Sequence, residues 1–435
     1  MGRSGIDQKE YPIQLRGAIA EYLPARGLQL TGNARWSDRL LVIVMILMVF
    51  SSRSTLQERF MEARSLCVRM YFSRRRPSKS FVGFIKKMQR HSERLLTLIT
   101  DSLRRKMREN SGEHWRVGRF LAFGVDGTKI DTPRTKANQK KFKNGGRKKS
   151  GPQMLLVSLI HLGTGLVWGW RKAHARGSER GLLREMLGEL PAGSLLVADA
   201  GFVGYDVMCA IIASGRSILM RAGANTMLLK RLGFVVRESG SIVYLWPQAA
   251  RRRCAPPLVL RQIVLKDGRN RRMCLLTDVL LEKDLSEKEV RELYGRRWQA
   301  ELLYRAMKQT LARRKMLSDS PENAEVELDF SVLGQWLLGM MLWDARQEKA
   351  CVQEGFAAAL RTVRYAMAGQ GDRRCGLRKQ MELIGTDRYV RRRPKKSRNW
   401  PHKKNDPPCQ VPELRMATIA EVRLAKRLRE SRMAA

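Results

Sequence analysis

The spacing of the apolar residues changes near residue 116. This change constrains the possible folds of the chain more than any other feature of its sequence. Upstream, apolar residues recur every three or four positions between basic ones, as in amphipathic helices, in the segments 9–23, 37–50, 54–72 and 81–108. Downstream, short apolar runs are separated by turns that contain glycine, which is typical of β-strands. The pattern predicts an α/β protein with a helical N-terminal domain and a mixed sheet.

Strands and helices are expected to alternate over residues 116–225. In chain order we expect a strand that ends in Asp126, two strands joined by a turn at Gly163-Thr164-Gly165, a helix at 178–189, a strand that ends in Asp199, a helix closed by Gly215, and a strand at 217–221. Both Asp126 and Asp199 are thus expected at the carboxyl ends of strands, where ligand sites of open α/β sheets tend to gather.

A second strand-rich stretch, 226–281, is expected to form a β insertion. Its expected strands are GFVVRES, SIVYLW, PLVLRQIVL and RRMCLLTDVL. A long helix should then begin after Ser286, which forms a capping box with Glu289, and run to about Leu311. Further helices are expected at 328–343, 351–368 and 417–431.

The balance of charge points to a polyanionic partner. The chain has 84 lysines and arginines against 41 acidic residues, a formal net charge of +43. Such a surplus costs self-repulsion unless a polyanion offsets it, and nucleic acid is the usual polyanion. A generically basic ribosomal or membrane-surface protein is the alternative. The basic, proline-rich stretch 391–409 is expected to be disordered until it meets DNA.

Cysteine and histidine usage argues against several kinds of site. The seven cysteines and five histidines are scattered and form no CxxC pair, which speaks against a disulfide framework and a zinc site and fits a reducing cytoplasm. The N-terminus lacks the apolar core of a signal peptide. The apolar run from Leu40 to Phe50 has eleven residues, whereas a membrane span needs about twenty. We therefore expect a buried core helix there and no membrane partner.

The helix expected after Ser286 places one carboxylate among cations and aromatic side chains. At about 100° per residue, four of its residues fall within about 60° of one another: Tyr294, Arg297, Glu301 and Lys308. Trp298 and Arg305 lie beside this stripe, and the opposite side is apolar. A solvated helix face with ordinary charge pairs is the alternative. Together with Asp126 and Asp199, however, the stripe suits divalent metals that also contact phosphates, because two-metal phosphodiester cleavage needs carboxylates and magnesium prefers oxygen ligands.

The spacing Y-x2-R-x3-E-x6-K in this helix resembles the signature of the DDE transposases of bacterial insertion sequences, in particular the insertion-sequence-four (IS4-like) family. Two more segments resemble that family: VDGTKIDTPRTKAN around Asp126 and LLVADAGFVGYD around Asp199. The resemblance covers roughly 116–345. It implies an RNase H-like catalytic core in two parts, 116–225 and 282–345, separated by the β insertion.

The resemblance also implies roles for individual residues. Asp126, Asp199 and Glu301 would be the catalytic residues and would hold Mg2+, with Mn2+ as a substitute. Tyr294, Arg297 and Lys308 would hold the phosphates of the transposon end. The other DNA-binding candidates are Trp298, Arg305, Arg221 and Trp246. Alternatives stay open for two of these: a core position is favoured over DNA contact for Trp246, and Arg221 could as easily be an edge charge.

Other charged residues near the two aspartates have simpler interpretations. We interpret Asp131 as a loop residue and Asp206 as a helix cap, not as metal ligands. The lysines of 136–149 lie beside the strand of Asp126, which favours contact with phosphate over a purely solvated loop.

The expected function is cut-and-paste transposition by two-metal cleavage, with a hairpin intermediate and strand transfer. The partners would be double-stranded DNA, namely terminal inverted repeats and target DNA, and a second copy of the chain in a homodimer on paired ends. The flanking regions would be a helical DNA-binding region at 1–115, a helical region at 346–390 and a basic, partly disordered tail at 391–435. The protein is expected in the cytoplasm, on the bacterial nucleoid when bound to DNA. The alternatives are an RNase H-like nuclease and a domesticated or inactive DNA-binding relative.

Overall fold

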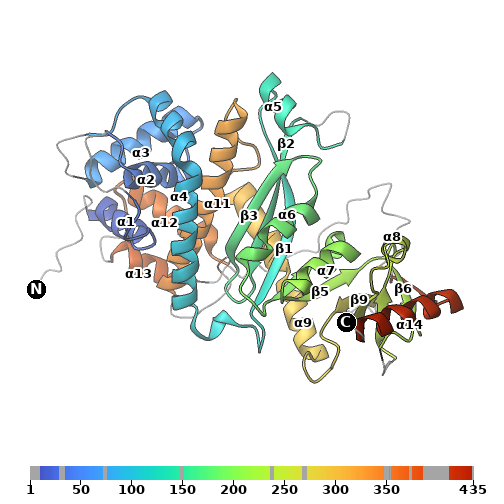
Figure 1. Ribbon diagram of the computed structural model, residues 1–435. Coiled ribbons are helices and arrows are strands. Elements are labelled where there is room, and N and C mark those ends of the chain that lie inside the picture. Colours follow the sequence, from blue (N-terminus) through green and yellow to red (C-terminus); the bar gives the residue numbers. More distant parts are fainter. Residues whose placement is uncertain are drawn as a thin grey trace, which may run out of the picture. The chain divides into compact units, whose positions relative to one another are not determined.

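The chain divides into two compact units, each assembled from separate stretches of sequence. The division is seen in a computed structural model that describes residues 10–28, 35–71, 76–146, 151–235, 240–266, 272–346, 352, 354–371, 375–385 and 411–433 (Figure 1). The helical unit comprises Met1–Trp115, Gly127–Ser178 and Gln299–Arg388. The sheet unit comprises Arg116–Asp126, Glu179–Trp298 and Tyr389–Ala435.

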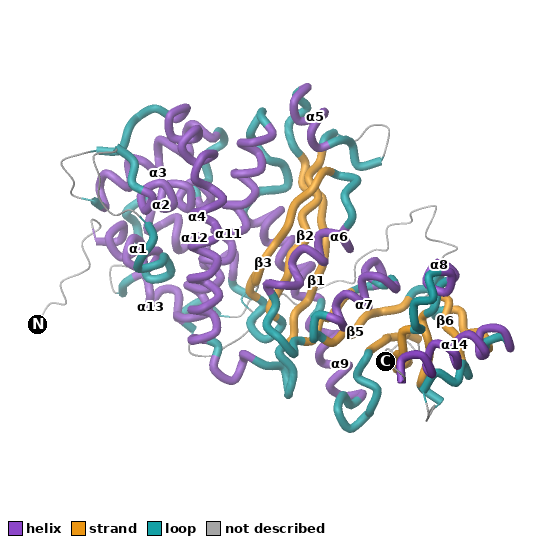
Figure 2. The backbone as a smooth tube through the Cα atoms, viewed as in Figure 1, coloured by secondary structure: helices purple, strands orange, loops and turns teal. Residues whose placement is uncertain are grey.

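Helices make up most of the helical unit (Figure 2). They are α1 (Glu10–Ala20), α2 (Asp38–Phe50), α3 (Leu56–Met70), α4 (Phe81–Asn110), η1 (Gly112–Trp115), α5 (Lys136–Phe142), α10 (Trp298–Arg305) from its second residue onward, η4 (Ala306–Thr310), α11 (Pro321–Ala345), α12 (Phe356–Met367) and α13 (Leu377–Glu382). The helices α1 to α4 lie where the apolar spacing predicted them. Helix α11 begins earlier than expected, because the Ser320 side chain caps it and Pro321 suits its first turn.

Helix α2 contains the long apolar run and forms the centre of the helical unit. The side chain of Ser37 accepts a hydrogen bond from the Leu40 amide and caps the helix start. Every residue from Leu41 to Phe50 is buried, and α2 packs against α3, α4 and α11. The prediction of a buried core helix is therefore confirmed. Among the residues that the structure describes, no helix has both the length and the apolar character needed to cross a membrane.

The helical unit also contains a β-hairpin that helices α4 and α11 cover. Its strands, β2 (Gln153–His161) and β3 (Leu166–His174), pair antiparallel on either side of the predicted glycine turn. A third strand, β1 (Ala122–Asp131), begins in the sheet unit, and its last residues belong to the helical unit. Since β1 runs on to Asp131, the expected strand end at Asp126 and the loop assignment of Asp131 are both wrong.

The sheet unit is built on strands that pair in the order β10-β6-β7-β8-β9-β5-β4-β1. Besides the start of β1, these are β4 (Leu195–Ala198), β5 (Ser217–Ala222), β6 (Met227–Lys230), β7 (Ile242–Leu245), β8 (Leu258–Lys266), β9 (Arg272–Thr277) and β10 (Glu413–Met416). Strands β1, β4 and β5 are parallel, and the run from β5 through β9, β8 and β7 to β6 is antiparallel. The mixed α/β fold is thus confirmed.

The expected β insertion continues the same sheet, because β9 pairs directly with β5 through Leu219↔Thr277 and the following positions. Two of its elements differ from expectation. The segment MLLK forms β6, which was not predicted, whereas GFVVRES forms no strand as far as Val235, and its residues 236–239 lie outside the described residues. A short helix, α8 (Gln248–Arg252), was also not predicted.

The remaining helices of the sheet unit are α6 (Glu179–Met186), η2 (Leu187–Glu189), η3 (Ala200–Phe202), α7 (Tyr205–Ala213), α9 (Glu287–Arg296) and α14 (Ile419–Met433). From α14, Ala425 joins the buried cluster that includes Leu229, Tyr244 and Trp246. The preceding strand β10 adds to the sheet edge by pairing parallel with β6. The basic stretch 391–409 lies outside the described residues, so its expected disorder stays a prediction.

Candidate active site

Asp126 and Asp199 occupy equivalent positions on neighbouring parallel strands of the sheet unit. The pairing of β1 with β4 sets Val125 opposite Ala198, and each aspartate is the next residue along the chain. Both side chains are half-buried. Because paired strands lie about 4.7–4.9 Å apart, the two carboxylates start from neighbouring backbone positions. Asp199 directly follows the last residue of β4, as predicted, whereas β1 continues beyond Asp126.

The carboxylate of Asp199 is fixed by two donors. Its Oδ1 accepts a hydrogen bond of 2.6 Å from the amide of Ala200, which starts the short helix η3. The same oxygen lies 2.9 Å from Nε of Arg221 on the adjacent strand β5. Arg221, one of the predicted DNA-binding residues, therefore already places its positive charge against a predicted metal ligand and is not an isolated edge charge.

Tyr294 and Arg297 form a second cationic group in the sheet unit. The guanidinium of Arg297 lies over the ring of Tyr294, 5.5 Å from its centre. Burial raises the pKa of Tyr294, and the negative charge of Asp199 raises it further, while Arg297 and Arg221 act in the opposite sense. Tyr294 is thus near enough to Asp199 to sense its charge, as a residue of the same site should be.

The helix predicted to run unbroken from Ser286 to about Leu311 is divided into α9, α10 and η4. The capping box of Ser286 with Glu289 is confirmed. The helix then tightens at Arg297, whose amide bonds to the carbonyl oxygen of Tyr294 three residues back, and it widens to a π-helix in η4. The prediction of one unbroken helix is therefore wrong, and a projection at 100° per residue does not hold across such changes of pitch.

Glu301 and Lys308 belong to the helical unit, where helix α10 is anchored on two sides. The Tyr304 hydroxyl accepts a hydrogen bond of 3.1 Å from the amide of Ser158 on β2, and the Leu303 carbonyl accepts one of 2.9 Å from Gln335 on α11. Glu301 is half-buried, one turn before Tyr304 and Arg305. Its backbone position is therefore held firmly by contacts that the sequence did not reveal.

Lys308 is directed toward strand β1. Its Nζ donates a hydrogen bond of 2.6 Å to Oγ1 of Thr128, two positions after Asp126. Residues two apart on a strand project from the same face, so Thr128 should share a face with Asp126. The sequence analysis missed Thr128, although this period of two along VDGT was a signal that points to it.

The predicted metal ligands are carboxylates. Asp126 and Asp199 offer the oxygen ligands that Mg2+ prefers. Within the described part of the chain, no group of three or more histidine, cysteine, aspartate or glutamate side chains is arranged to hold a metal ion. The two aspartates belong to the sheet unit and Glu301 to the helical unit. The structure thus brings together two of the three predicted ligands.

Trp246 is a core residue, which is the alternative that the sequence left open. Only 3% of its surface is exposed, and its indole N–H donates a hydrogen bond of 2.8 Å to the carbonyl of Ala255. It helps to line a cavity of about 470 Å³ together with Tyr205 and Arg415. By contrast, Trp298 is 50% exposed, and the surface of Arg305 is also open. Of the two tryptophans predicted to contact DNA, Trp298 is the accessible one.

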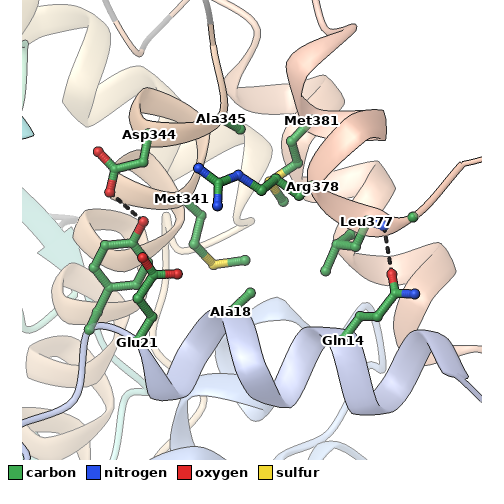
Figure 3. A pocket seen from close by; sticks show the side chains of 11 residues that line it. Gln14, Ala18, Glu21, Met341, Asp344, Ala345, Leu377, Arg378 and Met381 are labelled. Atoms are coloured by element: carbon green, nitrogen blue, oxygen red, sulfur yellow. Dashed lines mark hydrogen bonds between the residues drawn. The ribbon is translucent and has the colours of Figure 1, made fainter.

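A separate pocket of about 320 Å³ lies in the helical unit between α1, α11 and α13 (Figure 3). On its wall, the hydroxyl of Tyr22 donates a hydrogen bond of 2.5 Å to Asp344. Burial raises the pKa of Tyr22, and the charge of Asp344 raises it further. None of the predicted site residues lines this pocket. It is therefore distinct from the predicted site.

Two charged residues near the aspartates are explained by local contacts. Oδ1 of Asp131 accepts a hydrogen bond of 2.7 Å from Gln153 on β2. Asp206 lies in the first turn of α7 and pairs with Arg253 at 2.8 Å, while Gly204 occupies the cap position that we expected for Asp206. Neither residue needs a metal to account for its position.

Comparison with known proteins identifies the class. Residues 121–334, which include Asp126, Asp199 and Glu301, match the family described as "Transposase DDE domain". This region of the chain is therefore similar to the DDE domain of transposases. The chain is also similar to the transposase InsG for insertion sequence element IS4 of Escherichia coli (strain K12), with 27% identity over 227 residues. That match covers 49% of this chain and 50% of the relative, so the chain spans about half the length of the curated relative it matches.

Among solved structures, the cryo-EM structure of the piggyBac transposase synaptic complex with hairpin DNA is similar over 88% of this chain and 82% of that chain. The identity is 10% and the TM-score is 0.41. A likeness at this level does not establish a common fold.

Proposed function

We propose that this chain is a transposase that excises an insertion sequence by cutting DNA at its terminal inverted repeats and joining the freed ends to target DNA. The observation that carries the proposal is the pairing of Val125 with Ala198, which sets Asp126 and Asp199 side by side within a transposase DDE domain. The proposal includes an RNase H-like catalytic core.

Asp126, Asp199 and Glu301 are assigned as the catalytic carboxylates, which would hold Mg2+ or Mn2+. The assignment of the two aspartates rests on their neighbouring strand positions, and that of Glu301 on its resemblance and its place in the matched domain. When bound, a pair of such ions activates the attacking oxygen and stabilises the leaving oxygen. The backbone around Asp199 pre-orients one carboxylate oxygen, since the Ala200 amide holds it.

The cations of the site are assigned to the DNA backbone. Arg221 lies against Asp199, Arg297 lies over the Tyr294 ring, and Lys308 donates to Thr128 on the strand that carries Asp126. Such charges hold phosphates and dominate affinity for DNA. Tyr294, Trp298 and Arg305 complete the proposed contact set, with Trp298 placed to stack on an unpaired base.

The proposed order of events is a nick that frees a 3′-hydroxyl, attack of that hydroxyl on the opposite strand to give a hairpin, opening of the hairpin by water, and strand transfer. A hairpin crowds the terminal phosphates, and a cationic site offsets their repulsion. Two transposon ends require two protomers, so the active species on paired ends is a homodimer.

The test is cleavage of end-labelled DNA that spans the element boundary, with Mg2+, on a denaturing gel. Asp126→Asn, Asp199→Asn and Glu301→Gln should each abolish cutting and leave end binding largely intact, because binding rests on the cations. Asp206→Asn is the matched control, since it neutralises an exposed carboxylate outside the assigned set and should cut normally. Near-normal cutting by any of the first three variants would overturn the assignment. Cutting without any joining would favour a nuclease.

A further inference from the structure

The segment that follows Lys308 runs beside the end of strand β1 within the helical unit. The amide of Asp131 donates a hydrogen bond of 3.1 Å to the carbonyl of Arg314, and the amide of Met316 donates one of 2.8 Å to the carbonyl of Asp131. The position of Lys308 relative to Thr128 therefore depends on how this segment is held.

Arg313 holds the segment from within the core. Its side chain is 2% exposed and donates to several acceptors. These bonds are Nε to Ser331 Oγ at 3.3 Å, Nη1 to the Leu311 carbonyl at 3.2 Å, and Nη2 to the carbonyls of Met48 at 3.3 Å and Val49 at 3.1 Å. Met48 and Val49 lie in the last turn of α2, where carbonyls lack partners within the helix and favour a cation.

Glu327 holds the other end of the same segment. This buried carboxylate on α11 accepts hydrogen bonds from the amides of Leu317, at 3.0 Å, and Ser318, at 3.0 Å, and from the Ser318 hydroxyl at 2.7 Å. The hydroxyl of Ser331, which accepts from Arg313, donates in turn to the Glu327 carbonyl at 2.6 Å. One connected network thus fixes the chain from Leu311 to Ser318.

Burying Arg313 is costly, which argues that its position matters. Burial lowers the pKa of Arg313 to about 9, with the charges of Arg59 and Arg364 acting in the same sense and Glu327 opposing them. A cation so placed destabilises the fold unless its hydrogen bonds are well made. Another arginine, Arg364 on α12, caps the same helix end from a half-buried position through a bond of 2.8 Å to the Phe50 carbonyl. Capping of α2 therefore does not explain why Arg313 in particular is buried.

We infer that Arg313 is a positioning residue for the transposase reaction, which ties α2 of the N-terminal helical region to the segment that follows Lys308 and runs beside β1. It reaches no DNA, because it is buried, and it acts through the placement of Lys308 and Glu301. This inference rests on the proposed function. It predicts that loss of Arg313 slows the chemistry of bound DNA more than it weakens binding, since small displacements of reacting groups are costly.

The experiment compares Arg313→Gln with Arg364→Gln in the full-length chain. Both variants remove one arginine from the end of α2, but only the first disturbs the segment after Lys308. We expect Arg313→Gln to cut pre-bound ends about 10- to 100-fold more slowly, with end affinity within about twofold of the unmutated chain. Arg364→Gln should lose thermal stability yet cut bound ends at the unmutated rate. Hydrogen exchange at the amides of Asp131 and Met316 should accelerate in Arg313→Gln alone.

The inference would be overturned if both variants cut bound ends more slowly in proportion to their loss of stability. Normal cutting by Arg313→Gln would overturn it as well. If Arg313→Gln does not fold, Ser331→Ala replaces it, because it removes the acceptor of the Arg313 Nε bond together with the hydroxyl's own bond to the Glu327 carbonyl. This variant should slow cutting in the same direction without loss of affinity, and an unchanged rate would overturn the inference. Failure of the proposed function is separately visible, since the unmutated chain would then not cut transposon ends at all.

Discussion

Replacing Trp246 by phenylalanine separates its core role from a role in stacking on DNA. The change removes the hydrogen bond of 2.8 Å to the Ala255 carbonyl and leaves that acceptor without its donor. It also leaves a gap beside Tyr244 and Leu229 in a cluster where Trp246 is only 3% exposed. Together, the lost bond and the lost packing should lower the free energy of unfolding by about 2–4 kcal/mol.

Trp298→Ala is the matched control, because this tryptophan of the same unit is 50% exposed. It should change the free energy of unfolding by no more than about 0.5 kcal/mol. If Trp298 stacks on a base as proposed, the same change should weaken complexes with transposon ends by about 1–3 kcal/mol. Trp246→Phe should therefore lower stability, whereas Trp298→Ala should weaken DNA binding and leave stability almost unchanged.

The assay is guanidinium unfolding followed by circular dichroism, with end binding measured on the same preparations. A free energy of unfolding for Trp246→Phe within about 0.5 kcal/mol of the unmutated value would refute the core interpretation. Loss of end binding in such a stable variant would restore the stacking role that the sequence suggested.

Two further predictions concern stability. Gly163→Ala should lower the free energy of unfolding by about 2–3 kcal/mol, because its new Cβ would lie 1.9 Å from the His114 carbonyl oxygen. Gly17→Ala in helix α1 should raise it by about 0.5–1 kcal/mol, because its new Cβ meets nothing within 4 Å. Thermal unfolding of both variants checks this, and equal shifts would contradict it. The second concerns pH. Hydrogen bonding to Ser286 lowers the pKa of Glu289 in the folded state. The ionised carboxylate therefore stabilises the fold above about pH 4.5, and this stabilisation is lost as the pH falls through the folded pKa. Glu289→Gln should lower the free energy of unfolding by about 1 kcal/mol at pH 7, and that free energy should fall less steeply below pH 4.5 than in the unmutated chain. If the free energy of unfolding depends on pH below 4.5 in the same way in both chains, Glu289 is not the cause of the acid dependence.

Local patterns were sufficient wherever a residue's neighbours in sequence decide its structure. The capping box at Ser286 and the hairpin turn after His161 lie where the sequence places them, because caps and turns are made by residues a few positions apart. The same reasoning failed at Asp126. The polar residues after it look like a strand end, but β1 continues to Asp131, whose backbone pairs with Arg314 and Met316 far along the chain.

The sequence by itself determined the helical N-terminal region, the mixed α/β class and the two aspartates that follow apolar strand segments, since these depend on spacing and composition. Only the tertiary structure decided that Asp126 and Asp199 are neighbours, that β9 pairs with β5, and that Trp246 is buried. It alone also placed Arg313 against the end of α2. Strand register and side-chain burial are set by contacts between residues far apart in the chain, and a spacing pattern within one segment carries no information about the partner that will cover it.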